Sequence, residues 1–358
     1  MKILADATLP NLSILFREPL ILATYKNQKE LHDLLPESEV LLCRSTLKVT
    51  KELLADSKIK CIASASSGID HIDSKYLTTA GIKLFDAKGS NARSVADYVI
   101  ATIAYLSKSN LIKGNKAGVI GVGEVGKLVV KRLEAAGFEV ICFDPLKEKL
   151  NSNYSYSSLA ELTTCDLISV HANLHNIKPH ASLNLISSNF FNSLKPNTVI
   201  INASRGGIIN EEALLNNLNP LTYCTDVYIN EPNINKDLID KATICTPHIA
   251  GHSIEAKNGA VLNLSQQLHQ YYGLSMPLIN QNFNTQPQLQ EKAWQDLILD
   301  LYNPIKDTKI LKTTSNLAES FLIRRKSHTN RHDFSFYNSS LLNDKTKLLL
   351  GFNDQPLS

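Results

Sequence analysis

Short apolar runs and amphipathic stretches alternate along the chain. In the first 95 residues, apolar runs at 40–43, 59–63 and 82–85 are typical of buried strands, whereas the spacing over 51–55 is typical of a helix. The opening residues, as far as Pro10, predict a further strand that ends in a turn. Strands and helices that alternate in this way predict an α/β fold built on a parallel sheet.

Two longer helical patterns lie further along. The stretch 95–107 is strongly apolar and suited to connect one domain to the next, and 256–272 would return the chain to the first domain. Between them, brief apolar runs each end in a polar or charged residue. Such strand ends line the ligand crevice of a parallel sheet, so we expect functional residues there. The runs are 167–170, 198–202, 223–227 and 243–245.

Gly121, Gly123 and Gly126 form the motif G-x-G-x-x-G between the apolar run 117–120 and the amphipathic stretch 127–136. In this order the motif binds the pyrophosphate of a dinucleotide. One glycine makes the turn, one lets the backbone approach the phosphates, and one lets the helix pack on the strand. The free N–H groups at the start of the helix face the same phosphates. We therefore predict a Rossmann domain.

An acidic residue completes the dinucleotide motif. The apolar run 139–143 is followed by Asp144, about 20 positions after the glycines. A carboxylate there accepts hydrogen bonds from a ribose hydroxyl and repels a 2′-phosphate, so the sequence favours NAD over NADP. Within the glycine loop we also expect Glu124 and Val125 to contact the cofactor.

Three loops after predicted strands carry an arginine, a carboxylate and a histidine: Arg205 in N-A-S-R-G-G, Glu231 in D-V-Y-I-N-E-P and His248 in P-H-I-A-G. Oxidation of a 2-hydroxy acid requires these three groups. A guanidinium grips a carboxylate, and an imidazole takes the hydroxyl proton as hydride leaves for a nicotinamide. A glutamate on the other ring nitrogen orients the imidazole. Each residue alone is more often structural, but together and in this order they predict a dehydrogenase.

Charge and cysteine content narrow the setting. The 358 residues carry a formal net charge of +3, too small to indicate a nucleic-acid or membrane partner. The start lacks the apolar core of a signal peptide, and no run of about 18 apolar residues occurs. The six cysteines form no C-x-x-C pair and sit mostly in apolar runs, as expected in a reducing cytoplasm. We expect no metal site, because the histidines His71, His171, His175 and His180 lack partners at ligand spacing.

The segment 275–290 is rich in Asn, Gln and Pro, which is typical of a linker or a mobile loop. The residues after it predict a small, less regular unit with a basic run, Arg324, Arg325 and Lys326, followed by Arg331. We interpret these four cations as a solvated basic face. A contact with a substrate phosphate across a dimer is the lesser hypothesis.

On its three loop motifs, the chain resembles the D-isomer-specific 2-hydroxyacid dehydrogenases, in which N-A-x-R-G, D-V-x-x-x-E-P and H-I-x-G hold the catalytic residues. The resemblance implies that His248 is the general acid/base, Glu231 its orienting partner and Arg205 the anchor of the substrate carboxylate. It also implies a discontinuous, flavodoxin-like substrate domain beside the Rossmann domain.

Further stretches resemble one branch of this family, whose members oxidise 4-phospho-D-erythronate to (R)-3-hydroxy-2-oxo-4-phosphobutanoate on the route to pyridoxal 5′-phosphate. The likeness covers 41–49, 63–73 and 89–92, and is looser over 301–331. It implies the same substrate and a homodimer formed through a small α+β C-terminal domain. The domains expected are a substrate domain from 1–95 and 253–275, an NAD domain at 96–252 and a dimerisation domain at 276–358.

The branch also implies particular contacts. Ser45 and Ser66 match its substrate positions, and Arg44 is a candidate for the substrate phosphate, as is Lys48, with plain solvent exposure an equal alternative for both cations. Its NAD positions are matched by Asp144, Ala203, Ser204, Asp226 and Gly251.

Two positions depart from the pattern. Ala172 replaces a threonine near the cofactor, where backbone contacts can remain, and His252 replaces a tyrosine at the substrate, where imidazole can still donate a hydrogen bond. Two alternative functions therefore stay open. One is another D-2-hydroxyacid dehydrogenase, acting on 3-phosphoglycerate or on glyoxylate and hydroxypyruvate, although the extension after 275 argues against glyoxylate. The other is an NAD-sensing binding protein resembling a co-repressor, which the complete set of three loop residues disfavours.

Overall fold

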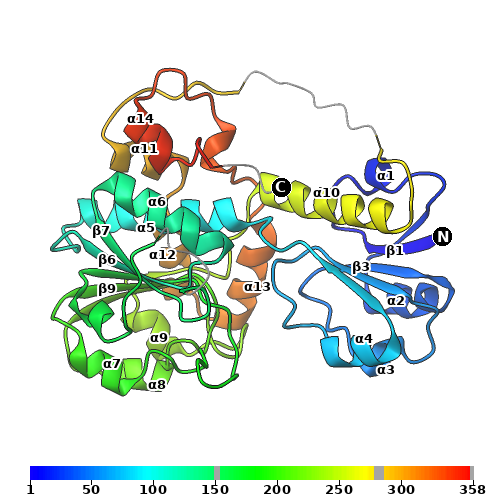
Figure 1. The fold of residues 1–358 in the computed structure, drawn as a ribbon, viewed down its shortest axis with the longest axis horizontal. Coiled ribbons are helices and arrows are strands. Elements are labelled where there is room, and N and C mark those ends of the chain that lie inside the picture. Colours follow the sequence, from blue (N-terminus) through cyan, green and yellow to red (C-terminus); the bar gives the residue numbers. More distant parts are fainter. Residues whose placement is uncertain (149–153, 278–285, 355–358) are drawn as a thin grey trace. The chain divides into compact units, whose positions relative to one another are not determined.

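The computed structural model describes residues 1–148, 154–277 and 286–354, and it divides into two compact units (Figure 1). The first unit comprises Met1–Asn91 and the segment that begins at Ser253. The second comprises Ala92–His252 and the segment that begins at Gln286. Half of the expected linker at 275–290, residues 278–285, lies outside the described residues. Each unit contains one parallel sheet with helices on both faces, which confirms the predicted α/β class.

The first unit has a five-stranded parallel sheet in the order β2-β1-β3-β4-β5, which is the flavodoxin-like order. Its inner strands are buried on both faces, so their central residues form continuous apolar runs instead of alternating with polar residues. The strands are β1 (Lys2–Asp6), β2 (Ile21–Tyr25), β3 (Val40–Cys43), β4 (Cys61–Ser64) and β5 (Lys83–Asp86).

Helices cover both faces of this sheet. On one face Ala260, Leu264 and Leu268, spaced by one helical turn, place the apolar side of the long helix α10 in the core. The helices on this face are α1 (Leu12–Leu15) and α10 (Ile254–Tyr271), and those on the other are α2 (Gln28–Leu34), α3 (Lys51–Leu54) and α4 (Ser74–Ala80).

The second unit has a six-stranded parallel sheet in the order β11-β10-β9-β8-β6-β7. The chain passes from β6 to β7 on one side and later builds β8 on the other, so a topological switch point lies beside β6. Ligands of parallel α/β sheets bind at such a point, outside the carboxyl ends of the strands. The strands are β6 (Lys116–Ile120), β7 (Glu139–Phe143), β8 (Leu167–Val170), β9 (Thr198–Asn202), β10 (Leu221–Thr225) and β11 (Ile244–Cys245).

Two hydrophobic cores sandwich the second sheet, and Figure 1 shows α5 and α6 on one side with α7, α8 and α9 on the other. The first core contains α5 (Ala92–Lys108), α6 (Glu124–Ala136), α11 (Trp294–Leu301) and α14 (Asp344–Leu349). The second contains α7 (Ser188–Ser193), α8 (Glu211–Leu215), α9 (Lys236–Lys241), α12 (Ile305–Thr313) and α13 (Leu317–Ser327). Short 3₁₀ turns occupy Leu35–Glu37, Glu161–Thr164 and Phe334–Phe336.

The C-terminal segment packs onto both faces of the second unit. Its last described residue, Asp354, lies in a buried ion cluster with Arg132 of α6 and Asp97 of α5, and the Arg132 Nη2 to Asp354 Oδ2 distance is 3.1 Å. The sequence suggested a separate small unit here, whereas the contacts group this segment with the second unit. The boundary at 276 stays a prediction.

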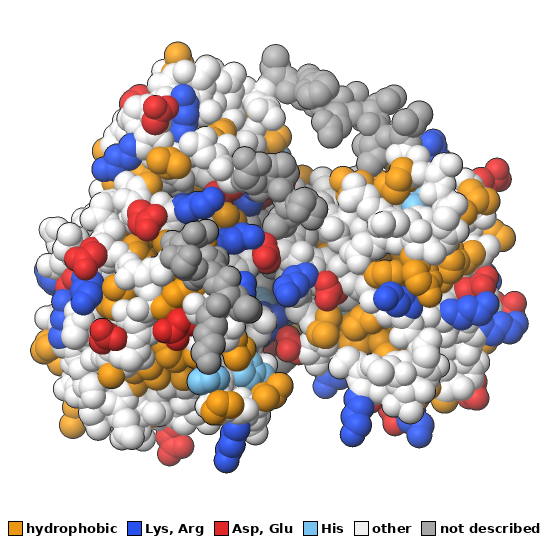
Figure 2. All heavy atoms as spheres, viewed as in Figure 1, with side chains coloured by type: hydrophobic (Ala, Val, Ile, Leu, Met, Phe, Trp, Pro, Cys, Tyr) orange, Lys and Arg blue, Asp and Glu red, His pale blue; other side chains and the backbone are white. Residues whose placement is uncertain are grey.

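The six cysteines are all free and buried, as expected from their apolar surroundings. Burial raises the pKa of the thiols, to about 11 for Cys165 and to about 12 for Cys43, Cys61, Cys142, Cys224 and Cys245. Acidic and basic side chains are interspersed over each unit on the face shown in Figure 2. Within the described part of the chain, no helix combines the length and apolarity needed to span a bilayer.

Candidate active site

The glycine loop after β6 has the geometry of a pyrophosphate cradle. Gly121 has a φ of 85°, and a Cβ there would lie 2.7 Å from the backbone nitrogen of Ala172. A Cβ on Gly126 would lie 2.0 Å from the carbonyl oxygen of Gly121, so only glycine lets α6 pack this closely. A Cβ on Gly123 would instead meet no atom within 4 Å. The first and third glycines are therefore needed for packing, and the second leaves space for a ligand.

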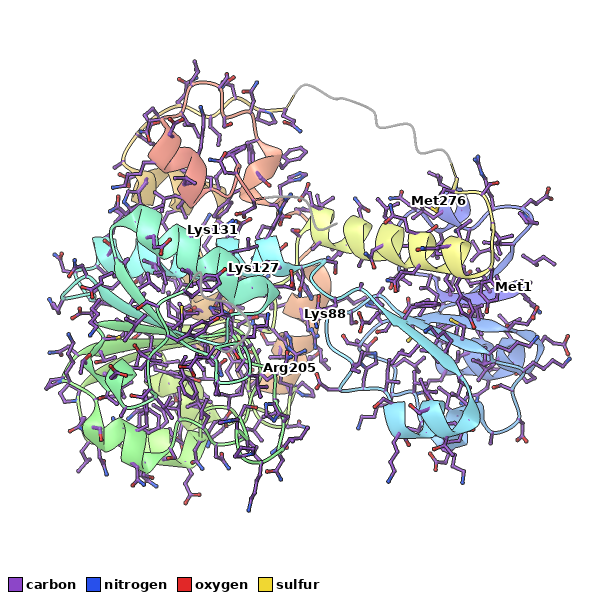
Figure 3. All side chains as sticks on the ribbon, viewed as in Figure 1. Met1, Lys88, Lys127, Lys131, Arg205 and Met276 are labelled. Carbon is purple, nitrogen blue, oxygen red and sulfur yellow. The ribbon has the colours of Figure 1, made fainter. Side chains whose placement is uncertain are left out.

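The start of α6 and the end of β7 complete this cradle. Gly123 caps α6 without a side-chain hydrogen bond, so the first N–H groups of the helix are available to phosphate oxygens. Asp144 accepts a hydrogen bond from the N–H of Val122 through Oδ2, at 2.8 Å, and thereby braces the loop. Glu124 pairs at 2.6 Å with Lys127, which is labelled in Figure 3, on the first turn of the helix. The residues present fit NAD.

The loop after β9 is held by a buried amide. Asn202 accepts hydrogen bonds from the N–H of Ser204 at 3.1 Å and from its hydroxyl at 2.8 Å, and donates to the carbonyl of Arg205 at 3.0 Å. A Cβ on Gly206 would lie 2.1 Å from the carbonyl carbon of Tyr228. Only glycine therefore lets the Arg205 loop, marked in Figure 3, lie directly against the loop that carries Glu231.

Glu231 and His248 form a hydrogen-bonded pair. His248 Nδ1 lies 2.7 Å from Glu231 Oε2, and Glu231 Oε1 accepts from the N–H of Tyr228 at 3.0 Å. Burial alone would raise the pKa of Glu231, but His248, that N–H and Arg325 together hold the pKa below its usual value. The His248 side chain remains 29% exposed, so its outer edge is open to a ligand. A carboxylate on Nδ1 fixes the ring and leaves Nε2 for proton transfer.

Asp226 shapes the backbone around His248, which has a φ of 56°, in the left-handed region that few side chains adopt. The Asp226 carboxylate is buried and accepts hydrogen bonds from Thr246 Oγ1 at 2.6 Å, Ile249 N at 2.8 Å and Ala250 N at 2.7 Å. Burial raises the pKa of Asp226 to about 6. The Asp226 carboxylate thus holds the loop that carries His248 in place. The contact of Asp226 with the cofactor stays a prediction.

The C-terminal cations are not the solvated face that the charge run suggested. Arg331 is 7% exposed, donates to the carbonyls of Ala250 and Ser94, and lies 4.8 Å from the centre of the Tyr302 ring. Arg325 Nη1 lies 4.0 Å from Glu231 Oε2, and Arg324 lies 3.9 Å from Asp307. Of the four, Lys326 alone is exposed. A run of charges in sequence does not reveal which helix face each side chain occupies, and this is why the prediction was wrong.

The predicted substrate residues divide between the units. Arg205, Glu231, His248 and His252 belong to the second unit, where the His252 ring lies 6.4 Å from the ring of His328. In the first unit, Arg44 pairs with Asp6 at 2.8 Å, Ser45 is exposed and Ser66 is partly buried.

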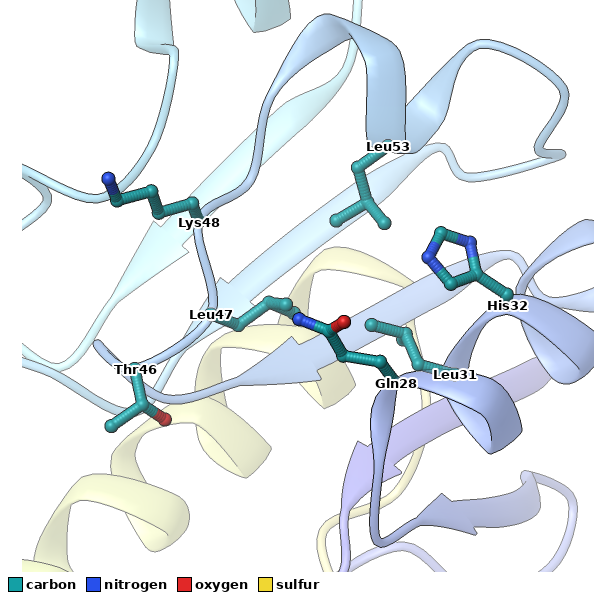
Figure 4. Close-up of a pocket in the computed structure, with 7 residues that line it drawn as sticks. All are labelled: Gln28, Leu31, His32, Thr46, Leu47, Lys48 and Leu53. Carbon is teal, nitrogen blue, oxygen red and sulfur yellow. The ribbon is translucent and has the colours of Figure 1, made fainter.

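The first unit also contains an open cavity of about 330 Å³ beside the loop after β3 (Figure 4). In Figure 4 the Gln28 amide lies beside Leu47, and the Lys48 amino group points away from it. Of the residues predicted to contact the substrate, Lys48 lines this cavity, whereas Arg44, Ser45, Ser66 and His252 do not. Its lining residues are Gln28, Leu31, His32, Thr46, Leu47, Lys48 and Leu53.

Comparison with known proteins agrees with this geometry. Residues 101–250 match the family model of the NAD-binding domain of D-isomer specific 2-hydroxyacid dehydrogenases. The NAD-dependent formate dehydrogenase of Staphylococcus aureus, solved with NAD, superposes with a TM-score of 0.63 at 21% identity, covering 76% of this chain and 96% of its own. The NAD-bound 3-phosphoglycerate dehydrogenase of Entamoeba histolytica gives 0.63 at 23%, covering 76% and 95%. Fold and motifs thus define an NAD-dependent oxidoreductase of the 2-hydroxyacid dehydrogenase class.

Relatives of known sequence narrow the class. An erythronate-4-phosphate dehydrogenase of Legionella pneumophila is 49% identical over 337 residues, which cover 94% of this chain and 96% of the relative. One from Coxiella burnetii is 37% identical over 351 residues, covering 94% of both. The chain belongs to the erythronate-4-phosphate dehydrogenase family.

Proposed function

We propose that this protein oxidises 4-phospho-D-erythronate to (R)-3-hydroxy-2-oxo-4-phosphobutanoate with NAD⁺, in the biosynthesis of pyridoxal 5′-phosphate, vitamin B6. The substrate is taken from the relatives, which are erythronate-4-phosphate dehydrogenases. The observation that carries the reaction type is the 2.7 Å contact between His248 Nδ1 and Glu231 Oε2, beside a loop that bears Arg205.

The reaction removes a proton from the C2 hydroxyl and a hydride from C2. His248 takes the proton on Nε2, and the Glu231 carboxylate stabilises the imidazolium that forms. Arg205 binds the substrate carboxylate, which fixes C2 near the imidazole. When bound, NAD⁺ supplies the hydride acceptor. His248 then releases its proton to solvent.

The remaining site residues are assigned by position. The glycine loop with Glu124 and Val125, the Ala172 backbone, Asp144 and the loops of Ala203, Ser204, Asp226 and Gly251 would bind NAD. Ser45, Ser66, Arg44 and His252 would contact the substrate. Homodimerisation through the C-terminal segment is part of the same proposal, by analogy with the family. So is a cytoplasmic location, which the six free cysteines support.

The test is NADH formation by the purified protein with 4-phospho-D-erythronate, 3-phospho-D-glycerate and D-glycerate in parallel. Separate reactions contain a 2-oxo acid to reoxidise bound NADH, and in these the oxidised product is measured instead. We expect a strong preference for the phosphoerythronate and a loss of about 10²- to 10⁴-fold in kcat for His248→Ala. Preference for another acid would overturn the substrate but keep the reaction type. No NADH from any acid, in a folded protein, would overturn both.

A further inference from the structure

Helix α13 of the C-terminal segment is seated on the loop that carries Glu231. Phe321 is buried, and its ring meets that of Tyr228 edge-on, with ring centres 6.0 Å apart. Arg325 follows Phe321 by four positions and so lies on the same face of the helix. Tyr228 in turn donates its N–H to Glu231. The aromatic contact therefore sets the position of the helix that brings Arg325 to the carboxylate.

The contact between Arg325 and Glu231 acts through charge. At 4.0 Å, Arg325 Nη1 is too far from Glu231 Oε2 for a hydrogen bond, and the same oxygen is hydrogen-bonded to His248 Nδ1. Both side chains are mostly buried, with 24% of Arg325 and 18% of Glu231 exposed, so water screens the interaction less than at an open surface.

Two further carboxylates, those of Glu211 and Asp226, lie near the Glu231–His248 pair. Glu211 accepts from the N–H of Ile229 at 2.8 Å, and burial together with the nearby Glu231 raises the pKa of Glu211. Asp226 accepts hydrogen bonds from the N–H groups of Ile249 and Ala250, directly after His248, and the charge of His248 lowers the pKa of Asp226. Arg325 is thus a cation on the same Glu231 oxygen that His248 contacts.

We propose that Arg325 is a positioning residue of the active site: its guanidinium shares the Glu231 carboxylate with His248 and so keeps His248 in its neutral, proton-accepting form at lower pH. The inference rests on the function proposed above. A carboxylate alone stabilises the imidazolium and raises the pKa of its histidine. A second cation on the same oxygen opposes that effect, because two positive charges then compete for one negative charge. The C-terminal segment, distant in sequence from the catalytic loops, thereby sets the working pH.

Two variants and a control isolate the charge. Arg325→Gln removes the cation and keeps a polar side chain, whereas Arg325→Lys retains the charge. Lys326→Gln removes the same charge from the next, exposed position, which lies about 100° away around the helix. For each protein we would titrate His248 by NMR with ¹³C-labelled histidine, assigning the signal by its loss in His248→Gln, and record kcat/KM against pH.

In Arg325→Gln we expect the pKa of His248 and the acidic limb of kcat/KM to move upward by about 0.5–1 pH unit. Rates should converge with wild type once His248 is neutral in both proteins. Arg325→Lys should restore most of the shift, and Lys326→Gln should match wild type. Thermal unfolding would confirm that each variant is folded.

Two results would overturn the inference. One is an unchanged His248 titration in folded Arg325→Gln. The other is a kcat/KM that falls by the same factor at every pH, which would make Arg325 a substrate ligand instead. Failure of the wild-type protein to oxidise any of the acids would count against the proposed function alone, since the NMR titration does not require turnover.

Discussion

The two units share one architecture, but they differ in how closely backbone packs at their glycines. Both have a parallel sheet between two layers of helices. In the second, a Cβ at Gly121, Gly126 or Gly206 would overlap neighbouring backbone, whereas at Gly81 in the first a Cβ would meet open space. The loops of the second sheet are therefore held in place by backbone contact that one methyl group would disturb. Proton and hydride transfer need that degree of positioning.

The polar residues at the strand ends differ in the same way. Asn202 and Asp226 of the second unit are 1% exposed each, and each fixes a neighbouring loop through several hydrogen bonds. In the first unit, Ser45 is exposed and Arg44 keeps 41% of its side chain exposed although it pairs with Asp6. The loops at the strand ends of the second unit are thus held in fixed positions by buried hydrogen bonds. The side chains offered by the first can adjust to a ligand.

Among the changes that test this comparison of the two units, the largest effect should come from adding a methyl group at Gly206. With a Cβ placed 2.1 Å from the Tyr228 carbonyl, the Glu231 loop must shift, and we expect Gly206→Ala to cost about 3 kcal/mol and kcat about 10- to 100-fold. The matched change in the first unit is Gly81→Ala, which meets no neighbour but has a φ of 69°. It should cost about 1 kcal/mol and leave kcat unchanged. Urea unfolding and steady-state kinetics measure both, and equal losses of kcat would refute the comparison.

A smaller effect, of opposite sign in the two units, is expected in the pH dependence of stability. Burial raises the folded-state pKa of Asp226 to about 6, so between about pH 4 and 6 the folded state keeps a proton that the unfolded state loses, and the free energy of unfolding falls as pH rises. Burial raises the pKa of Asp6, but the hydrogen bonds from Thr8 and Arg44 and the charge of Arg44 together lower it by more. The folded-state pKa of Asp6 is therefore below its usual value of 3.8. Its contribution is present above that pH and is lost as pH falls through the folded pKa.

Asn substitutions expose these two contributions. Relative to wild type, Asp226→Asn should remove the part that declines between pH 4 and 6, and it should also lower kcat because an amide cannot accept from all three donors. Asp6→Asn should remove the part that is lost in acid. Urea titrations from pH 3 to 7 give both differences. Slopes of the same sign would contradict the assignment.

The smallest effect belongs to the exposed side of the first unit. Ser45→Ala removes a single hydroxyl, so we expect KM for 4-phospho-D-erythronate to rise about 2- to 10-fold with kcat unchanged. Ser13→Ala, another exposed serine of the same unit, is the control. A fall in kcat with unchanged KM would show that Ser45 acts on the chemical step and not on binding.

Much of this fold follows from periodicity, and the exceptions have physical causes. The buried strands β3, β8 and β9 lie where their apolar runs predicted. The edge strand β2 was missed although the apolar residues 20–23 mark it in the sequence, and at the edge of the sheet its side chains are partly exposed, with Ile21 at 63%. The run 223–227 misses the first two residues of β10 and extends two residues beyond its end, where the Asp226 side chain holds the next loop.

The candidate site was predictable to the extent that each loop carries its own motif. Arg205, Glu231 and His248 each stand in such a motif, and the structure brings the last two into contact. Arg325 was not found, because its partner Glu231 is 94 positions away in the chain. A run of charged residues also does not reveal toward which side of the helix each side chain points. The signal that could have found it is the spacing of Phe321 and Arg325, an aromatic and a cation on one helical face.

The buried cysteines can report where the protein opens locally, because their thiols react only when they become exposed. With pKa values near 12, the cysteines hardly form thiolate at neutral pH, and a labelling reagent reaches them only when a strand or core helix opens. Cys43 and Cys61 lie in one unit and the other four in its neighbour. The order in which they become labelled therefore tells which half of the molecule loosens first, with no reporter added.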